Sequence, residues 1–419
     1  MTAVKLKTVC RKIGSGSTPR GGKDSYSSSG TALIRSQNVL DMQFSPSGLA
    51  FINDSQAEKL KNVSVGSRDV LLNITGDSVA RVCVMNPEFL PARVNQHVSI
   101  IRTIEDVLNS RYLLYFLQAR KQYLLKLAAN GSTRNALTKE DIGQISIELL
   151  PLQLQEKLAF ALDVLQEKIQ VNNQVNNNLA AMLHTLYEYW FIQFEFPDEN
   201  GKPYRSSGGK MVWNEHLKRE IPEGWNVENL LNIATWIGGS QPPKSEHISV
   251  DRPGYIRFIQ NRDYSGDTHI TYIPISGSNK ICDEFDIMVD KYGDAGKTRF
   301  GIAGAYNVAL SRIEVLLTNG QEYIRQFLGS SGVKQYFSSS SMASTRASLN
   351  ESNLAFLYLA IPGSALLAKF ETQAKSIIKL VIENRKENQR LGKLRDWLLP
   401  MLMNGQATIS SESTKLSFT

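Results

Sequence analysis

The middle of the chain carries an apolar pattern typical of a long helix that packs against another helix. The pattern recurs in alternating steps of four and three residues, at Leu158, Leu162, Leu165, Ile169, Asn172, Asn176, Leu179, Leu183, Leu186 and Trp190. This spacing is the seam of a coiled coil. It predicts a spacer helix within residues 151–195, and a helix over about 35 of these residues would be on the order of 50 Å long.

The same seam occurs a second time, 212 residues further along the chain. The equivalent positions are Phe370, Ala374, Ile377, Val381, Asn384, Asn388, Leu391, Arg395, Leu398 and Leu402. We therefore expect a second spacer helix within residues 362–404. A helix with a continuous apolar face needs a partner, and the other copy of the seam is the simplest candidate.

Two asparagines interrupt each seam at equivalent positions. Asn172 and Asn176 fall at core positions of the first copy, and Asn384 and Asn388 fall at those of the second. A buried Asn lowers stability unless it faces another polar group, so it specifies register and partner. We predict an antiparallel pair in which the asparagines meet near the middle. A single helix could simply tolerate such residues in solvent, but their duplication favours the register role.

Shorter motifs outside the helices repeat in the same order. At the offset of 212, Ser132-Thr133-Arg134 matches Ser344-Thr345-Arg346, Asn95 matches Asn307, and Leu137 matches Leu349. Gly76-Asp77 matches Gly293-Asp294 at an offset of 217, and Gln37-Asn38 matches Gln260-Asn261 at 223. Any one match could be chance, but the shared order predicts a duplicated architecture whose loops differ in length.

The segments flanking the helices have mixed α and β character. Short β-like runs such as TALIRSQNVL, DVLLNIT and HVSIIRT are bounded by Gly, Ser, Asn and Pro, and helical stretches follow them. We expect an α+β domain over residues 1–150 and a similar one over residues 221–361. Residues 196–220 are predicted to form a linker with a small hairpin, and residues 405–419 a disordered tail.

Composition adds a modest preference for an anionic partner. Lys and Arg outnumber Asp and Glu 47 to 40, which gives a formal charge of +7. Cys10, Cys83 and Cys282 are odd in number and widely separated, which disfavours a disulfide framework or a zinc site and favours a reducing cytoplasm. No apolar run approaches the roughly 18 residues needed to cross a bilayer. We expect a cytoplasmic protein without membrane association.

The motifs of common catalytic sites are absent from the sequence. GDAGKT at 293–298 resembles the end of a phosphate-binding loop, but the full pattern needs a glycine where Lys291 stands. The five histidines show no metal-ligand spacing, and there is no nucleophile elbow. No Asn/Asp-Pro-Pro-Tyr segment of an amino-methyltransferase occurs. We expect a chain that is not an enzyme and binds no metal.

In length and in the order of its elements, the chain resembles the DNA specificity (S) subunit of a Type I restriction-modification enzyme. The likeness rests on GSGSTPRGG at 14–22, the Gly-Asp pairs, VNQHVSIIR at 94–102, STRNALTKEDIGQISIELLP at 132–151 and IPEGW at 221–225. The resemblance implies two similar α+β target recognition domains separated by an antiparallel coiled coil of two long helices, a pseudo-two-fold internal repeat.

The resemblance also implies a function. A non-catalytic S subunit would read a bipartite DNA target in a bacterial or archaeal cytoplasm, with one recognition domain per half-site and the helices setting the gap. Two methyltransferase (M) subunits with S-adenosylmethionine would methylate adenine, and two translocase-endonuclease (R) subunits with ATP and Mg²⁺ would cut unmodified DNA; the chain itself would hold no cofactor. Candidates for the docking face are Tyr187, Trp190, Phe191, Trp397 and Leu399, although core packing in the coiled coil is favoured for Trp190.

Residues suited to DNA contact fall into three groups. Candidates for phosphate contacts are Ser15, Ser17, Thr18, Arg20, Lys23, Gly239, Ser240 and Lys244. Candidates for base readout are Arg35, Gln37, Asn38, Asn95, Gln96, His97, Arg257, Gln260, Asn261 and Arg262. The Ser-Thr-Arg turns would either bind a phosphate or orient the following helix, through Thr133, Arg134, Thr345 and Arg346. For the other candidates, the alternative is a surface polar or turn-stabilising residue.

Two other classes of protein stay open at the level of sequence. A non-catalytic coiled-coil scaffold without specific DNA binding would explain the helices, but not the basic balance and the duplicated turn motifs. A fused enzyme would need catalytic signatures that are absent. Binding to random duplex DNA distinguishes the scaffold from the DNA reader.

Overall fold

The computed structural model describes residues 3–129, 135–266, 269–342, 348–409 and 416–418. The chain forms two compact units. The first unit contains Met1–Gln170 and Asn388–Thr419, and the second contains Val171–Glu387. Each unit therefore combines one mixed α and β body with portions of both long helices.

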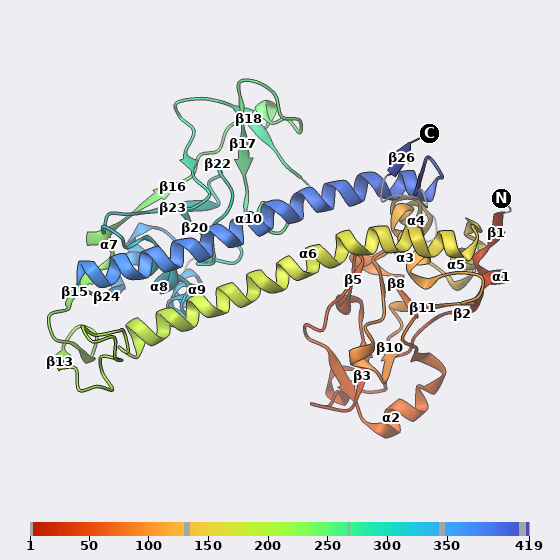
Figure 1. The fold of residues 1–419 in the computed structure, drawn as a ribbon, viewed down its shortest axis with the longest axis horizontal. Helices are drawn as coiled ribbons and strands as arrows, with labels where there is room; N and C mark the ends of the chain where they lie inside the picture. Colours follow the sequence, from red (N-terminus) through yellow and green to blue (C-terminus); the bar gives the residue numbers. More distant parts are fainter. Residues whose placement is uncertain (1–2, 130–134, 267–268, 343–347, 410–415, 419) are drawn as a thin grey trace. The chain divides into compact units, whose positions relative to one another are not determined.

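Two four-stranded sheets form the body of the first unit (Figure 1). The antiparallel sheet has the order β2 (Cys10–Ser15), β11 (Val98–Thr103), β8 (Val70–Asn73) and β9 (Val82–Val84). The other sheet has the order β6 (Ala50–Ile52), β3 (Thr31–Ile34), β10 (Ala92–Val94) and β7 (Ser64–Val65), and its β3–β10 pair is parallel. Strands β3 and β8 are buried along their whole length, which explains their continuous apolar runs.

Shorter elements complete the first body. Strand β1 (Ala3–Lys5) pairs with β12 (Ser146–Glu148), and β4 (Val39–Leu40) pairs with β5 (Gln43–Phe44). The helices are α1 (Leu6–Val9), α2 (Asp54–Lys59), α3 (Ser110–Ala119), α4 (Lys121–Ala129) and α5 (Lys139–Gln144). Short 3-10 helices are η1 (Gly22–Ser25), η2 (Ser36–Asn38), η3 (Lys61–Val63), η4 (Gly76–Ser78) and η5 (Pro87–Phe89).

The body of the second unit has the same construction. Its antiparallel sheet has the order β16 (Ala234–Gly238), β23 (Leu310–Val315), β20 (Ile287–Asp290) and β21 (Thr298–Arg299). Its other sheet has the order β18 (Tyr272–Pro274), β17 (Tyr255–Ile259), β22 (Gly304–Tyr306) and β19 (Ile281–Cys282), with β17 and β22 parallel. Strand β15 (Asn226–Asn229) pairs with β24 (Tyr358–Ile361). The helices are α7 (Leu230–Ile233), α8 (Gln321–Gly329), α9 (Ser331–Met342), η7 (Lys244–Glu246), η8 (Asn261–Tyr264) and η9 (Glu351–Phe356).

Backbone hydrogen bonds confirm the internal repeat. The amide of Leu137 donates to the carbonyl of Ile74 at 2.8 Å, and that of Leu349 donates to Lys291 at 3.2 Å. These pairs reproduce the offsets of 212 and 217 that the sequence motifs predicted. The two bodies therefore share topology and register as well as strand order.

One predicted match between the bodies is wrong by two residues. The amide of Arg35 donates to the side chain of Asn38, and the amide of Gln260 donates to the side chain of Asp263. Both bonds close the same capping box, so Arg35 is equivalent to Gln260 and Asn38 to Asp263. The offset here is 225, the difference between residues 35 and 260, instead of 223. Asn and Asp serve the same capping role, which hides the match in the sequence.

The segment between the first long helix and the second body is folded. Strands β13 (Met211–Asn214) and β14 (Arg219–Pro222) form the small hairpin that was predicted. Buried Phe194 and Ile221 pack there with partly buried Phe196 and Trp225. At the other end of the sequence, residues 405–419 were predicted to be disordered; within them β25 (Ala407–Ile409) pairs with β26 (Leu416–Phe418).

Two long helices carry the predicted seams. Helix α6 runs from Leu152 to Tyr187 and continues as a π-helical segment, η6 (Glu188–Ile192), and helix α10 runs from Ser364 to Met403. Figure 1 draws α6 in yellow to green and α10 in blue. Every predicted seam position is buried or partly buried, whereas the neighbouring Asn173, Asn177 and Asn178 are exposed. The α+β class with two similar domains and two paired long helices is thus confirmed.

Polar contacts set the antiparallel register within each unit. In the second unit, the Nδ2 of Asn384 donates to the Oδ1 of Asn176 at 2.9 Å, which confirms the predicted meeting of asparagines. Asn172 donates to Glu387 at 2.6 Å. In the first unit, the Nη1 of Arg395 donates to Gln166 at 2.7 Å and Asn388 reaches the carbonyl of Ile169 at 3.4 Å.

The apolar residues at the helix ends belong to the cores of the bodies. Tyr187, Trp190, Phe191 and Leu399 are each no more than 5% exposed. The predicted docking role is therefore wrong for Tyr187, Phe191 and Leu399, whereas the core packing favoured for Trp190 is confirmed. Seam residues near the ends of the helices also pack into the core of the adjoining body. In the first unit these include Leu158 and Leu398, and in the second Trp190 and Phe370. Among the five docking candidates, Trp397 alone is exposed, at 46%.

The asparagine pair gives a direct test of register. Replacing Asn176 by Leu leaves the Asn384 amide without its partner, so we expect the free energy of unfolding to fall by about 1 kcal/mol. Replacing both residues by Leu removes the unpaired amide and should recover this loss, because an apolar layer packs in a coiled coil. Chemical denaturation of both variants measures the difference, with exposed Asn177→Leu as the matched control. Equal destabilisation by the single and the double change would contradict the pairing.

A candidate nucleic-acid interface

A tight turn at residues 95–97 lies at the centre of the candidate site in the first body. Asn95 is 7% exposed; its Oδ1 accepts the amide of His97 at 3.1 Å, and its own amide donates to Ile34 at 3.0 Å. The structure therefore gives Asn95 a turn-stabilising role, which corrects its prediction as a base reader. The turn holds the exposed side chains of Gln96 and His97 outward.

Two neighbouring loops contact this turn. The hydroxyl of Thr18 donates to the Oε1 of Gln96, and the Oγ1 of Thr75 lies 2.6 Å from the Nδ1 of His97. The loop that carries Thr18 passes so close to the turn that a Cβ at Gly16 would overlap the carbonyl oxygen of Val94. The structure thus brings the predicted residues Thr18, Gln96 and His97 together.

The η2 turn lies beside the same loops. Asn38 is fully buried, and its Nδ2 donates to the carbonyls of Ser45 and Ser47 at 2.9 and 3.1 Å. Because its side chain is buried and its amide donates to two carbonyls of the protein, Asn38 is no longer a candidate for base contact. Gln37 is exposed, although its Nε2 donates to Gly48 at 3.1 Å. The partly buried Arg35 donates to the same carbonyl at 2.5 Å, which leaves Gln37 as the accessible side chain of this turn.

The remaining candidates of the first body are exposed or lie outside the described residues. Ser15 is exposed at the end of β2, and Ser17 and Arg20 are exposed along the loop that follows. The side chain of Lys23, and the whole of Thr133 and Arg134, fall outside the described part of the chain. We call residues 16–20, 36–38, 75–78 and 95–97 the first loop cluster.

The second body repeats this arrangement. The Oδ1 of Asn307 accepts the amide of Ala309 at 3.2 Å, and a Cβ at Gly239 would overlap the carbonyl oxygen of Asn307. The amide of Ser240 donates to Tyr306 at 3.1 Å, as that of Ser17 does to Val94 in the first body. Gly239 and Ser240 therefore hold a loop in place. We call residues 239–243, 261–264, 292–295 and 307–309 the second loop cluster.

The other candidates of the second body differ in accessibility. Arg262 and Lys244 are exposed, whereas Arg257 and Gln260 are partly buried, and Gln260 caps η8. The Nδ2 of Asn261 lies 3.5 Å from the carbonyl oxygen of Tyr292. Thr345 and Arg346 lie outside the described residues.

Sequence reasoning missed Thr75 and Tyr292. Both immediately precede the repeated Gly-Asp pair, and they occupy equivalent positions in the two loop clusters. The Gly-Asp repeat was the available signal, because Gly76 and Gly293 both have a positive φ and therefore mark a tight turn. The residue that enters such a turn beside exposed polar side chains is a reasonable candidate for ligand contact.

Buried charges and thiols in the bodies serve the fold. The guanidinium of Arg102 binds both oxygens of Asp69 at 2.7 Å, and Arg299 binds Asp290 at 2.9 Å. Burial raises the pKa of the Asp290 carboxyl, and the Arg299 guanidinium opposes that shift. Burial raises the pKa of the Cys282 thiol to about 12, so it is protonated at neutral pH.

Two other kinds of site are absent from the described residues. No three side chains of His, Cys, Asp or Glu are grouped so that they could hold a metal ion. Within the same parts of the chain, no helix combines the length and apolar character that a bilayer crossing requires.

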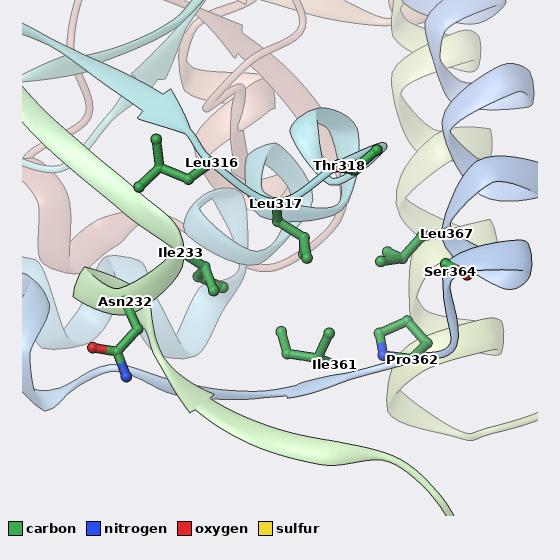
Figure 2. A pocket seen from close by; sticks show the side chains of 9 residues that line it. All are labelled: Asn232, Ile233, Leu316, Leu317, Thr318, Ile361, Pro362, Ser364 and Leu367. Atoms are coloured by element: carbon green, nitrogen blue, oxygen red, sulfur yellow. The ribbon is translucent and has the colours of Figure 1, made fainter.

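The second unit contains a pocket of about 430 Å³ beside the start of α10 (Figure 2). Leu316, Leu317, Ile361 and Leu367 line much of it, and none of the candidate DNA-contacting residues does. In the first body Gln155 stands at the position of Leu367, and its amide is bonded to the backbone at three points. Leu367, which lines the pocket, cannot make these bonds.

Comparison with known proteins shows which proteins the chain resembles. Residues 2–181 match the model of the Type I restriction modification DNA specificity domain. The Type I restriction enzyme MjaIX specificity subunit of Methanocaldococcus jannaschii is 25% identical over 73% of this chain and 71% of its own length. The HindI specificity subunit of Haemophilus influenzae is 20% identical over 89% of this chain and 94% of its own length.

A solved structure shares the fold. The S subunit of a Type I restriction-modification system from M. genitalium superposes with a TM-score of 0.57 at 12% identity, over 96% of this chain and 95% of that one. Sequence matches and fold agree with the duplicated bodies and long helices described above. Residues 2–181 of the chain thus resemble the Type I restriction modification DNA specificity domain, and most of its length is similar to specificity subunits of Type I restriction enzymes.

Proposed function

We propose that this chain reads a bipartite double-stranded DNA target, with one recognition domain per half-site, and directs the work of partner subunits on that DNA. The observation that carries the proposal is the loop cluster, which occurs once in each body on the same backbone framework. The similarity of residues 2–181 to a DNA specificity domain supports DNA as the ligand class. Two equivalent sites on one chain suit two half-sites of one target.

The first loop cluster has the chemistry of a base reader rimmed by phosphate contacts. Gln96 and His97 are exposed and can donate or accept hydrogen bonds at base edges. Ser17 and Arg20 lie on the adjoining loop and are suited to phosphate oxygens. Arg134 and Arg346, each in a Ser-Thr-Arg motif that precedes a long helix along the chain, are proposed as further phosphate contacts.

The long helices are proposed to act as the spacer between the half-sites. Each helix contributes to both compact units, and its seam is closed by polar pairs that specify register. In this proposal the recognition domains comprise residues 1–150 and 221–361, and the spacer helices lie within residues 151–195 and 362–404.

Partner subunits would perform the chemistry. Two M subunits with S-adenosylmethionine would methylate adenine in each half-site, which requires the base to leave the duplex. Two R subunits with ATP and Mg²⁺ would translocate and cut unmodified DNA. This chain would contribute the choice of sequence and no cofactor.

Two measurements test the proposal as a whole. A gel shift with random duplex DNA, with and without the M subunit, should show salt-dependent binding. Mapping of N6-methyladenine in DNA from cells that carry the complex should then reveal a two-part target. Absence of DNA binding at low salt, with the M subunit present, would favour the protein scaffold instead.

Replacement of Gln96 by Ala tests base readout in the first domain. One lost bidentate base contact is worth ~1–3 kcal/mol, so affinity for the target should fall by about 5- to 150-fold. Affinity for random duplex should not change. Gln153→Ala, an exposed glutamine at the start of α6, is the matched control. Equal losses on target and random duplex would show that Gln96 does not read bases.

Replacement of Arg20 by Ala tests phosphate contact. We expect weaker binding to every duplex, and a decrease of about 0.9 in the slope of log K against log salt for the lost contact. Arg68→Ala is the control, because Arg68 is also exposed but pairs with Glu105 at 2.6 Å. An unchanged slope for Arg20→Ala would exclude this contact.

A further inference from the structure

The two loop clusters present different chemistry at equivalent positions. Gln96 and His97 of the first cluster correspond to Val308 and Ala309 of the second, at the offset of 212. Val308 is 38% exposed. Two hydrogen-bonding side chains in one domain are thus replaced by two side chains that can neither donate nor accept.

The backbone that carries these residues is the same in both domains. The Asn95 side chain caps His97 at 3.1 Å, and the Asn307 side chain caps Ala309 at 3.2 Å. The carbonyl of His97 accepts the amide of Ile74 at 3.0 Å, and that of Ala309 accepts Lys291 at 2.8 Å. The side chains of Val308 and Ala309 are therefore attached at the same positions of the turn as those of Gln96 and His97 in the first domain.

The neighbouring loop also carries a different side chain in the two domains. Tyr292, 42% exposed, stands where Thr75 stands in the first domain, and Thr75 is the residue that bonds His97. Alanine at position 309 offers no such partner. The ammonium of Lys291 lies 5.7 Å from the centre of the Tyr292 ring. At the positions of Thr75, Gln96 and His97, the second domain thus presents an aromatic and two apolar side chains beside a cation.

We infer that the second recognition domain identifies a thymine through its C5-methyl group, which contacts Val308 and Ala309. The thymine methyl is the apolar group that base pairs of unmodified DNA display in the major groove. A polar base edge against Val308 would lose water without gaining a partner, which costs free energy. This inference rests on the proposed function and specifies the ligand chemistry of one half-site.

The test uses the complex with its M subunits and the target found by methylation mapping. Each thymine of that target is replaced in turn by deoxyuridine, which keeps base pairing and removes only the C5-methyl. We expect one such replacement to weaken binding by about fourfold, since a buried methyl-sized group is worth ~0.8 kcal/mol. In Val308→Ala the same replacement should weaken binding by less than about twofold.

Controls separate this inference from the proposed function. Val250 is 70% exposed in the same body but outside the loop cluster, so Val250→Ala should keep the full deoxyuridine effect. If no thymine shows an effect that depends on Val308 while the complex binds its target normally, the inference is overturned. If the complex neither binds nor methylates any specific sequence, the proposed function fails, and this inference falls with it.

Discussion

The apolar contact between each body and the two helices is the constraint on which the rest of the structure depends. In the first unit, one buried cluster joins α3 to Leu158 and Leu162 of α6 and to Leu398 of α10. In the second, Trp190 and Phe370 belong to the cluster that contains α8 and the sheet. Because the same side chains complete the helix seam and the core of the body, the helices and the bodies are not energetically independent.

Polar contacts add specificity to this apolar seam. The pair of Asn176 and Asn384 adds little stability, but a shift of one helix along the other by one layer would leave one of the two amides opposite an apolar neighbour. Arg111 anchors α3 to Asp163 of α6 at 2.6 Å in the first unit. In the second unit, Lys386 of α10 pairs with Glu284 at 2.5 Å. The two bodies thus make different ionic contacts with their helices, in addition to the apolar contact that both of them make.

The sequence predicted the parts that obey a strict period. Both seams, the strands within continuous apolar runs and the repeat itself are visible because spacing alone carries the signal. The sequence could not show that Asn38 and Asp263 are equivalent, because loop lengths differ and either residue can cap the turn. It also could not separate the outward Gln96 from the inward Asn95, since adjacent polar residues of a turn look alike until its hydrogen bonds are known.

The duplicated turns explain how two similar domains can carry different recognition chemistry. Gly16 and Gly239 let one loop approach the backbone of the next, and Asn95 and Asn307 close the turn with their own side chains. Substitution at these positions would change the framework in either body. The outward residues, such as Gln96 and its equivalent Val308, hold no backbone hydrogen bond of the turn and can change without that cost. The two loop clusters can therefore differ in a few outward side chains while they keep the same backbone framework.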